Sequence, residues 1–262
     1  MKTKSAPLSS ILLGTCLSIL VSCGSDGGSS GSSKVSLEEA KQDDQGVYRV
    51  VLKPINSTLA ADISGTMEIK IEGDDFIVES NIAGAPAGVK HYQNIMASTS
   101  CPETTGDTNG DSIIDVKEAM AKTGEVLIPL DSRLSEQLSG IDYGPISNGA
   151  GKYFYKRSSS LTEVLADLRS PDPDKFDSIV KLPFGEDLNL AGKVVVVHGV
   201  KSGIALAETV ATMRDLPIAQ SIPIACGKII RVNSEEPTPE LEPEPTTEEE
   251  TSTTETSPEV TI

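Results

Sequence analysis

The sequence predicts a mainly β fold, an antiparallel β-sandwich, on three observations. Short apolar runs recur along residues 35–232 and are separated by turn residues. One run, residues 67–71, alternates apolar with charged side chains and is joined by Gly-Asp-Asp to a second run at residues 76–82, which is hairpin chemistry. Only one helix is signalled clearly, at residues 161–168, where Ser160 and Glu163 have capping-box spacing. Antiparallel strands with one short helical insertion are typical of a sandwich.

In chain order, the expected strands are residues 47–52, 67–71, 76–82, 125–130, 153–156, 193–200 and 222–232. Four successive valines, residues 194–197, are apolar on both faces, so this strand should be central and covered on both sides. The domain spans residues 35–232, which is enough chain for one substantial core.

The first 22 residues resemble a bacterial lipoprotein signal peptide. A short basic start precedes an apolar stretch and then Leu20-Val21-Ser22-Cys23, which is similar to a lipobox. The resemblance implies cleavage before Cys23 and acylation of its thiol. The apolar stretch is too short and too rich in small polar residues to span a membrane. The alternative is an ordinary cleaved signal with a cysteine nearby.

The expected location follows from this resemblance. It implies a chain anchored in the bacterial cell envelope by lipid on Cys23, and Gly24 after the cysteine resembles outer-membrane sorting in a Gram-negative cell. Residues 23–34 then comprise the lipidated cysteine and a flexible Gly/Ser tether.

Residues 233–262 form an acidic tail with ten glutamates, no basic residue and no aromatic residue. Such a composition cannot bury enough apolar surface to order itself, so we expect disorder. The tail is either a solvated spacer or a segment that binds a basic partner.

The charge balance excludes some ligands. The chain has a net charge of −17, and without the tail and the signal peptide about −9 remains. An acidic domain argues against nucleic acid and anionic lipid as ligands.

Residues 107–118 have the spacing of an EF-hand or dockerin-type calcium loop, which they resemble at every ligand position. Oxygen donors at positions 1, 3, 5, 7, 9 and 12 can converge on one hard cation, and four of them are carboxylates that would otherwise repel one another. The predicted ligands are Asp107, Asn109, Asp111, the carbonyl of Ile113, Asp115 and Glu118.

Some features of this loop determine how tightly it is expected to bind calcium. Ile114, at position 8, should pin the loop to a core, and residues 115–122 should begin a short helix. Ser112 stands at the sharply turned sixth position, which favours glycine, so the loop should be strained by about 1 kcal/mol. Because no second loop pairs with it, we expect weak calcium binding, with Kd roughly 0.1–1 mM, and a structural role. The alternative is an acidic surface turn that binds no metal.

Cysteine counting predicts one disulfide. Of four cysteines, Cys16 leaves with the signal peptide and Cys23 carries lipid. The remaining pair, Cys101 and Cys226, should be oxidised in an exported chain. Two buried free thiols are the alternative.

Four segments together resemble chordin-repeat (CHRD) and copper/zinc superoxide dismutase-like domains. Residues 64–71 and 84–96 are similar to the family's strand, hairpin and first histidine segment, residues 194–200 to a later histidine strand, and residues 224–229 to the last strand. The resemblance implies a Greek-key-type sandwich. It also implies that Cys101 is the partner of the cysteine in the last strand.

The copper site of that family is largely missing. Asn94 and Met96 stand where the family has a His-x-His pair, and His91 and His198 are the two histidines of the whole chain. Two imidazoles cannot build a dismutase centre, so that activity is not expected. A residual copper site from His91, Met96 and His198 is one possibility, and core packing of Met96 with hydrogen-bonded histidines is the other.

The sequence therefore predicts a non-enzymatic, membrane-anchored envelope protein with calcium as its one cofactor and a structural or adhesive role. It does not identify a binding partner. The first alternative is copper binding or metal handling. A hydrolase with unrecognised carboxylates is a third hypothesis, although the lack of Trp makes a sugar cleft improbable.

Overall fold

The computed structural model describes residues 45–134, 144–170, 181–213 and 216–232. All of them belong to one unit of the chain, Leu37–Ile262. The predicted signal peptide, Cys23, the tether and the acidic tail lie outside the described residues. None of the described helices is long and apolar enough to cross a membrane.

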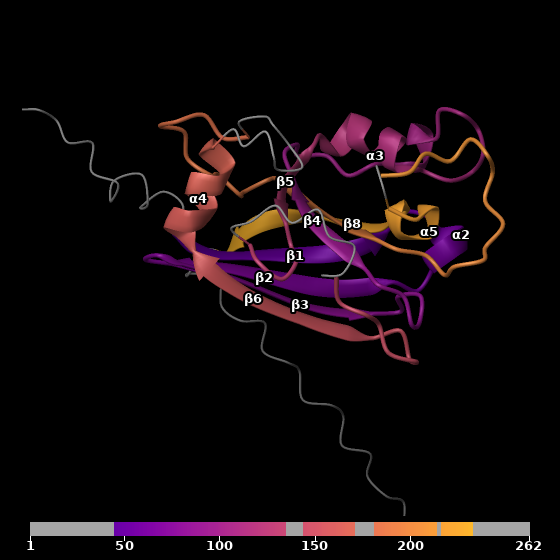
Figure 1. Ribbon diagram of the computed structural model, residues 1–262, viewed down its shortest axis with the longest axis horizontal. Coiled ribbons are helices and arrows are strands. Elements are labelled where there is room, and N and C mark those ends of the chain that lie inside the picture. Colours follow the sequence, from indigo (N-terminus) through magenta and orange to yellow (C-terminus); the bar gives the residue numbers. More distant parts are fainter. Residues whose placement is uncertain (1–44, 135–143, 171–180, 214–215, 233–262) are drawn as a thin grey trace, which may run out of the picture. The chain divides into compact units, whose positions relative to one another are not determined.

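The described residues form one antiparallel sheet of eight strands, which confirms the predicted mainly β fold (Figure 1). Their order across the sheet is β5-β4-β7-β8-β1-β2-β3-β6. The strands are β1 (Gly46–Pro54), β2 (Ser64–Glu72), β3 (Asp75–Ala83), β4 (Tyr92–Met96), β5 (Val126–Pro129), β6 (Tyr153–Ser160), β7 (Val194–His198) and β8 (Pro223–Val232).

The predicted hairpin is the β2–β3 pair. Glu72 lies opposite Asp75, so the loop between them has two residues, and Gly73 in that loop has a φ of 57°. Two-residue hairpin loops need positive φ, which glycine adopts without strain. Every second residue of β2 from Met67 to Ile71 is buried, as the alternating pattern predicted.

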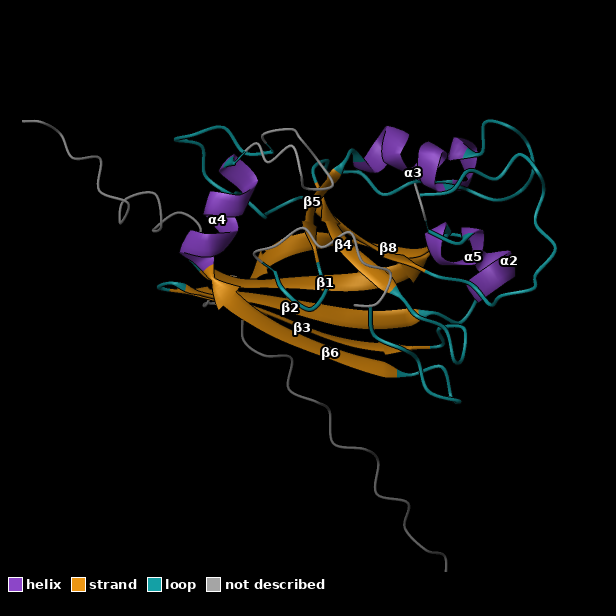
Figure 2. Cartoon of the chain, viewed as in Figure 1, coloured by secondary structure: helices purple, strands orange, loops and turns teal. Residues whose placement is uncertain are grey.

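The sheet curls so that its two ends face each other in a sandwich-like arrangement, with continuous hydrogen bonding through β8 (Figure 2). Ser80 of β3 donates a hydrogen bond to Gln93 Oε1 of β4 at 3.1 Å, although four strands separate β3 from β4 in the sheet order. The rings of His91 and Tyr153 stack with their centroids 5.2 Å apart. These contacts span the interior of the curl.

Apolar side chains fill both sides of the β4–β7–β8 half. The main core lies inside the curl and includes Val195 and Val197 of β7. A second cluster contains Val194 and Val196, together with Met96, on the opposite face of β7. The valine strand is thus buried on both faces between β4 and β8, and the prediction that it is central is confirmed.

Short helices close the ends and the outer face of the sheet. They are α2 (Ser57–Ala60), α3 (Val116–Thr123), α4 (Leu161–Arg169) and α5 (Ile218–Ser221), with a 3₁₀ turn, η1 (Thr104–Gly106). The predicted helical insertion is α4, where the Ser160 hydroxyl accepts from the Glu163 amide at 3.4 Å. Asp74, in the β2–β3 turn, accepts from the Thr162 amide at 3.0 Å and joins the hairpin to this helix.

Candidate metal centre

Cys101 and Cys226 form the predicted disulfide, with their Cα atoms 5.8 Å apart. Cys226 lies in β8 and belongs to the second apolar cluster, which Cys101 contacts. The bond therefore ties β8 to the segment that leads into residues 107–118. The alternative of two free thiols is wrong.

The first half of the 107–118 loop is a network of carboxylate and amide contacts. Asp107 Oδ1 accepts from the Gly110 amide at 2.8 Å, and Oδ2 accepts from the Ser112 amide at 2.7 Å. Asn109 Oδ1 accepts from the Asp111 amide at 3.0 Å, and Asp111 Oδ1 accepts from the Ile113 amide at 2.9 Å. The side chains at positions 1, 3 and 5 thus fold back on the loop's own backbone.

The second half of the loop is the start of α3. Asp115 caps this helix by accepting from the Lys117 and Glu118 amides at 2.8 and 3.0 Å, and Glu118 Oε2 accepts from the Asp115 amide at 3.1 Å. This reciprocal pair is a capping box. Glu118 Oε1 also accepts from the Thr108 amide at 2.7 Å, so position 12 reaches back to the beginning of the loop.

Backbone conformation at the sixth position follows the prediction. Ser112 has a φ of 69°, in the left-handed region that costs a non-glycine residue about 1 kcal/mol. Of the other described non-glycine residues, Asn189 alone also has positive φ.

Long-range contacts fix the loop to the sheet, and the sequence pattern did not reveal them. Asn56 is buried, and its side chain accepts from the Ile114 amide at 2.9 Å while donating to the carbonyls of Ile114 and Pro223 at 2.9 and 2.8 Å. Ile114 is itself buried in the second apolar cluster, as predicted for position 8. One asparagine thus connects the loop to the start of β8.

The loop also contacts the segment that precedes α5. The Thr209 hydroxyl donates to Asp111 Oδ2 at 2.6 Å, and the Ala211 amide donates to Asp115 Oδ2 at 2.7 Å. Both partners lie more than 90 residues away in the sequence, so no local signal identified them.

These contacts favour ionised carboxylates. The hydrogen bond from Thr209 is the main reason that the pKa of Asp111 is below its ordinary value. For Glu118, burial raises the pKa, but hydrogen bonds from Thr108, Asp115 and Asn109 outweigh burial and hold it below its ordinary value. Ionised oxygens are the form that binds a cation.

The donor chemistry of the loop fits calcium. Within the described ranges, no three His, Cys, Asp or Glu side chains meet closely enough to hold a metal by themselves. A calcium loop also uses amide and backbone carbonyl oxygens, which Asn109 and Ile113 of the predicted ligand set would supply. Both Asp115 carboxylate oxygens already accept backbone N–H groups, which suits a ninth-position residue that acts through water.

Met96 lies apart from the two histidines that were considered with it for copper. Tyr92 pairs with His198 at one end of the β4–β7 ladder, and Met96 pairs with Val194 at the other end. At about 3.3 Å per residue, this separation is roughly 13 Å along the strand. Met96 packs in the second apolar cluster, the role that the core-packing alternative gave it.

The two histidines are close to each other, but their rings have separate partners. His91 Nδ1 donates to the His198 carbonyl at 3.0 Å, and His198 Nδ1 donates to the Ser221 carbonyl at 2.9 Å. Burial lowers the pKa of both, to about 4 for His198, while these hydrogen bonds oppose that effect. Both rings are therefore neutral structural groups at neutral pH.

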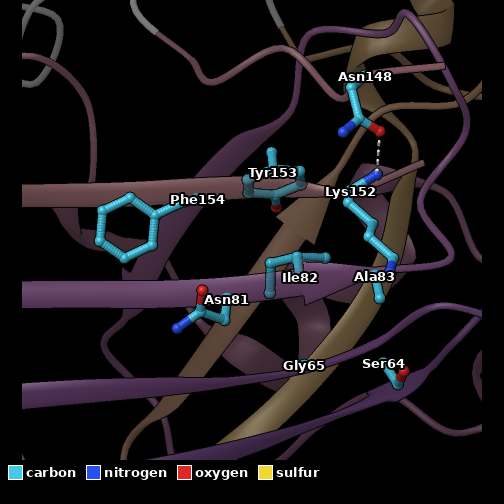
Figure 3. Close-up of a pocket in the computed structure, with 9 residues that line it drawn as sticks. All are labelled: Ser64, Gly65, Asn81, Ile82, Ala83, Asn148, Lys152, Tyr153 and Phe154. Carbon is cyan, nitrogen blue, oxygen red and sulfur yellow. Dashed lines mark hydrogen bonds between the residues drawn. The ribbon is translucent and has the colours of Figure 1, made fainter. Parts of the chain in front are cut away.

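A pocket of about 450 Å³ lies at the ends of β2, β3 and β6 (Figure 3). Its polar side chains include Asn81, Asn148 and Lys152, and the Asn148 side chain accepts from the Lys152 amide at 3.0 Å. No carboxylate or imidazole is among its lining residues, so this pocket offers no acid and base pair for a hydrolase.

No protein-family model matches the sequence, and no curated protein is similar enough to it to count as a relative. The resemblance to superoxide dismutase-like and CHRD domains therefore rests on the short segments of the sequence, and the structure shows the antiparallel β fold alone.

Proposed function

We propose that this chain is a non-enzymatic, lipid-anchored protein of the bacterial cell envelope. In this proposal a calcium ion in residues 107–118 and the Cys101–Cys226 disulfide together stabilise the β domain, which has a structural or adhesive role. The observation that carries the proposal is the loop itself. It combines ligand spacing at six positions with a left-handed sixth residue, a buried eighth residue and a capping box at positions 9 and 12.

Two further observations support an exported structural protein. The disulfide is of the kind that persists in oxidising compartments, and the lipobox-like residues 20–23 stand at the end of a signal-like segment. The loop and the disulfide both act on the connection between β4 and β5, since Cys101 precedes the loop and α3 follows it. A cation there would hold a long connection in place rather than switch a groove open.

Calcium is expected to stabilise the domain. With Kd of roughly 0.1–1 mM, about 10 mM calcium should raise the free energy of unfolding by about 1.5–3 kcal/mol, because a ligand stabilises the state that it binds. Asp107→Ala combined with Glu118→Ala should remove this dependence, since both end positions of the loop are lost. Urea unfolding followed by circular dichroism, with and without a chelator, measures the effect. Calorimetry that detects no calcium binding up to several millimolar would refute the calcium site.

Two control variants separate ligand loss from general damage. Asp62→Ala with Glu186→Ala removes two exposed carboxylates outside the loop and should leave the calcium dependence intact. Ser112→Gly should raise stability by up to about 1 kcal/mol with and without calcium, since it relieves positive-φ strain and removes no ligand. Ser202→Gly, at an exposed serine without positive φ, should not stabilise.

Lipid anchoring is tested independently of calcium. Cys23→Ser should move the protein from the membrane fraction to the soluble fraction and abolish labelling by a radioactive fatty acid, because one thiol carries the predicted acyl chain. Cys16→Ser, which lies within the segment predicted to be removed, should change neither. Retention of Cys23→Ser in the membrane fraction would contradict the anchor.

No contact in the described residues favours a copper site formed by His91, Met96 and His198. Met96 lies at the far end of the β4–β7 ladder from His198, and both imidazoles bind backbone carbonyls.

A further inference from the structure

The outer face of β1 and β8 carries a groove of about 710 Å³ that combines basic and aliphatic side chains. Arg49 lies opposite Ile230, and Lys53 lies opposite Cys226, so alternate residues of both strands point to this face. Val51 and Ile230 are 57% and 63% exposed. The Cys101–Thr104 segment lines the groove beside the disulfide.

The charge of the groove is opposite to that of the chain as a whole. Four cations line it against one carboxylate, Glu103, on a protein with a net charge of −17. The four are Arg49, Lys53, Lys228 and Arg231. Arg49 has a partner in Glu68 at 3.8 Å, whereas Lys53 and Lys228 form no ion pair within the described residues. A strip of exposed aliphatic and basic side chains suits an acidic, extended segment.

The chain itself supplies such a segment at the end of the groove. Val232, the last residue of β8, lines the groove, and the 30 residues that follow contain ten glutamates and no basic residue. From Cys226 to Val232 the groove runs roughly 20 Å along β8, whereas 30 extended residues can reach about 100 Å. Residues 233–262 therefore have ample length to fold back over it.

We propose that residues 235–244 of the same chain bind the β1–β8 groove. This stretch has five glutamates, and Leu241 lies between two of them as its one aliphatic residue. Prolines at positions 237, 239 and 243 favour an extended polyproline conformation, which reduces the entropy lost on docking. Attachment to β8 supplies a millimolar effective concentration, so several weak ion pairs are sufficient.

The consequence is a groove that its own tail occupies until a competing acidic ligand or high salt displaces it. The proposal does not depend on calcium or lipid, because neither the 107–118 loop nor Cys23 lines the groove.

A single fluorophore in the full chain tests whether residues 235–244 bind the β1–β8 groove. The protein has no Trp, so Leu241→Trp introduces a unique reporter. At low salt its emission should be blue-shifted and its quenching by acrylamide roughly twofold lower than in about 1 M salt, which screens exposed ion pairs. Lys53→Glu with Lys228→Glu should abolish the difference. Lys122→Glu with Lys201→Glu, at two exposed lysines outside the groove, should preserve it.

Two further measurements test the proposal: reversal of the charges on both the tail and the groove, and dilution of the protein. Adding Glu240→Lys and Glu242→Lys to the Lys53→Glu and Lys228→Glu variant should restore protection of the reporter. Protection should also be independent of protein concentration. Protection that disappears on dilution would place the tail on a second copy and overturn the proposal, as would a reporter that is equally quenched at all salt concentrations or unaffected by the groove substitutions.

Discussion

Removal of the disulfide is expected to lower the free energy of unfolding by about 4–5 kcal/mol. Cys101 and Cys226 are 125 residues apart, and in the chain-entropy model a crosslink over so long a loop greatly restricts the unfolded ensemble. Cys101→Ala with Cys226→Ala is the preferred variant. It leaves no lone thiol, and alanine adds no polar atom to the buried cluster around Cys226.

Urea unfolding of wild type and variant at equal calcium measures this difference. A reducing agent should lower the stability of wild type and leave the variant unchanged, which controls for effects of the alanines themselves. A loss below about 1 kcal/mol would show that the loop and α3 hold the β4–β5 connection to β8 without the covalent bond.

Acidification is expected to destabilise the protein through His198. Its imidazole is 2% exposed, and desolvation lowers its pKa to about 4, against an ordinary value of about 6.5, even though the hydrogen bond to the Ser221 carbonyl acts in the opposite direction. Since the unfolded chain takes up the proton at higher pH than the folded chain, the full stability is present above pH 6.5. It falls as the pH drops from about 6.5 to about 4, by about 3 kcal/mol in total.

The variant His198→Asn tests this because asparagine retains a side-chain N–H donor and does not titrate in this range. Between pH 7 and pH 4, wild type should lose about 3 kcal/mol more than the variant in urea unfolding. His91→Asn is the matched comparison. In wild type the pKa of the His91 imidazole is also lowered by burial, but two backbone carbonyls lie within hydrogen-bonding distance of its ring nitrogens and oppose the shift. Equal pH dependence of wild type and His198→Asn would contradict the prediction.

Local patterns predicted much of the fold. The β2–β3 hairpin, the central valine strand and α4 each follow from a periodicity, a turn or a cap within about 20 residues. Strand β4 is different, because Tyr-Gln-Asn-Ile-Met has successive polar residues and no alternation. Its polar side chains at Gln93 and Asn94 are buried by contacts from other parts of the chain.

In the candidate site, too, the features formed by neighbouring residues were predictable and those formed by distant residues were not. The spacing of the loop residues, the short helix that begins after Asp115 and the strained Ser112 were predicted from the sequence because each involves neighbouring residues, whereas the capping box of Asp115 and Glu118 was recognised only in the structure. The roles of Asn56 and Thr209 were not, since they act on the loop across 58 and 98 residues. For Met96 and the histidines considered for copper, the sequence suggested a proximity that the structure does not show. Met96 and His198 belong to neighbouring strands, and only the register placed them at opposite ends of the ladder.

The sequence by itself determined the strand periodicity, the turn and cap residues, the spacing of the 107–118 loop and the one cysteine pair of the β domain. The tertiary structure decided that the sheet is continuous and curled, that β7 is covered on both faces, and that basic and aliphatic residues of β1 and β8 form one groove. The physical reason is the distance along the chain over which each kind of interaction acts. Backbone preferences, caps and turns act between residues a few positions apart, whereas apolar burial is non-directional and selects its partners only when distant strands pack together.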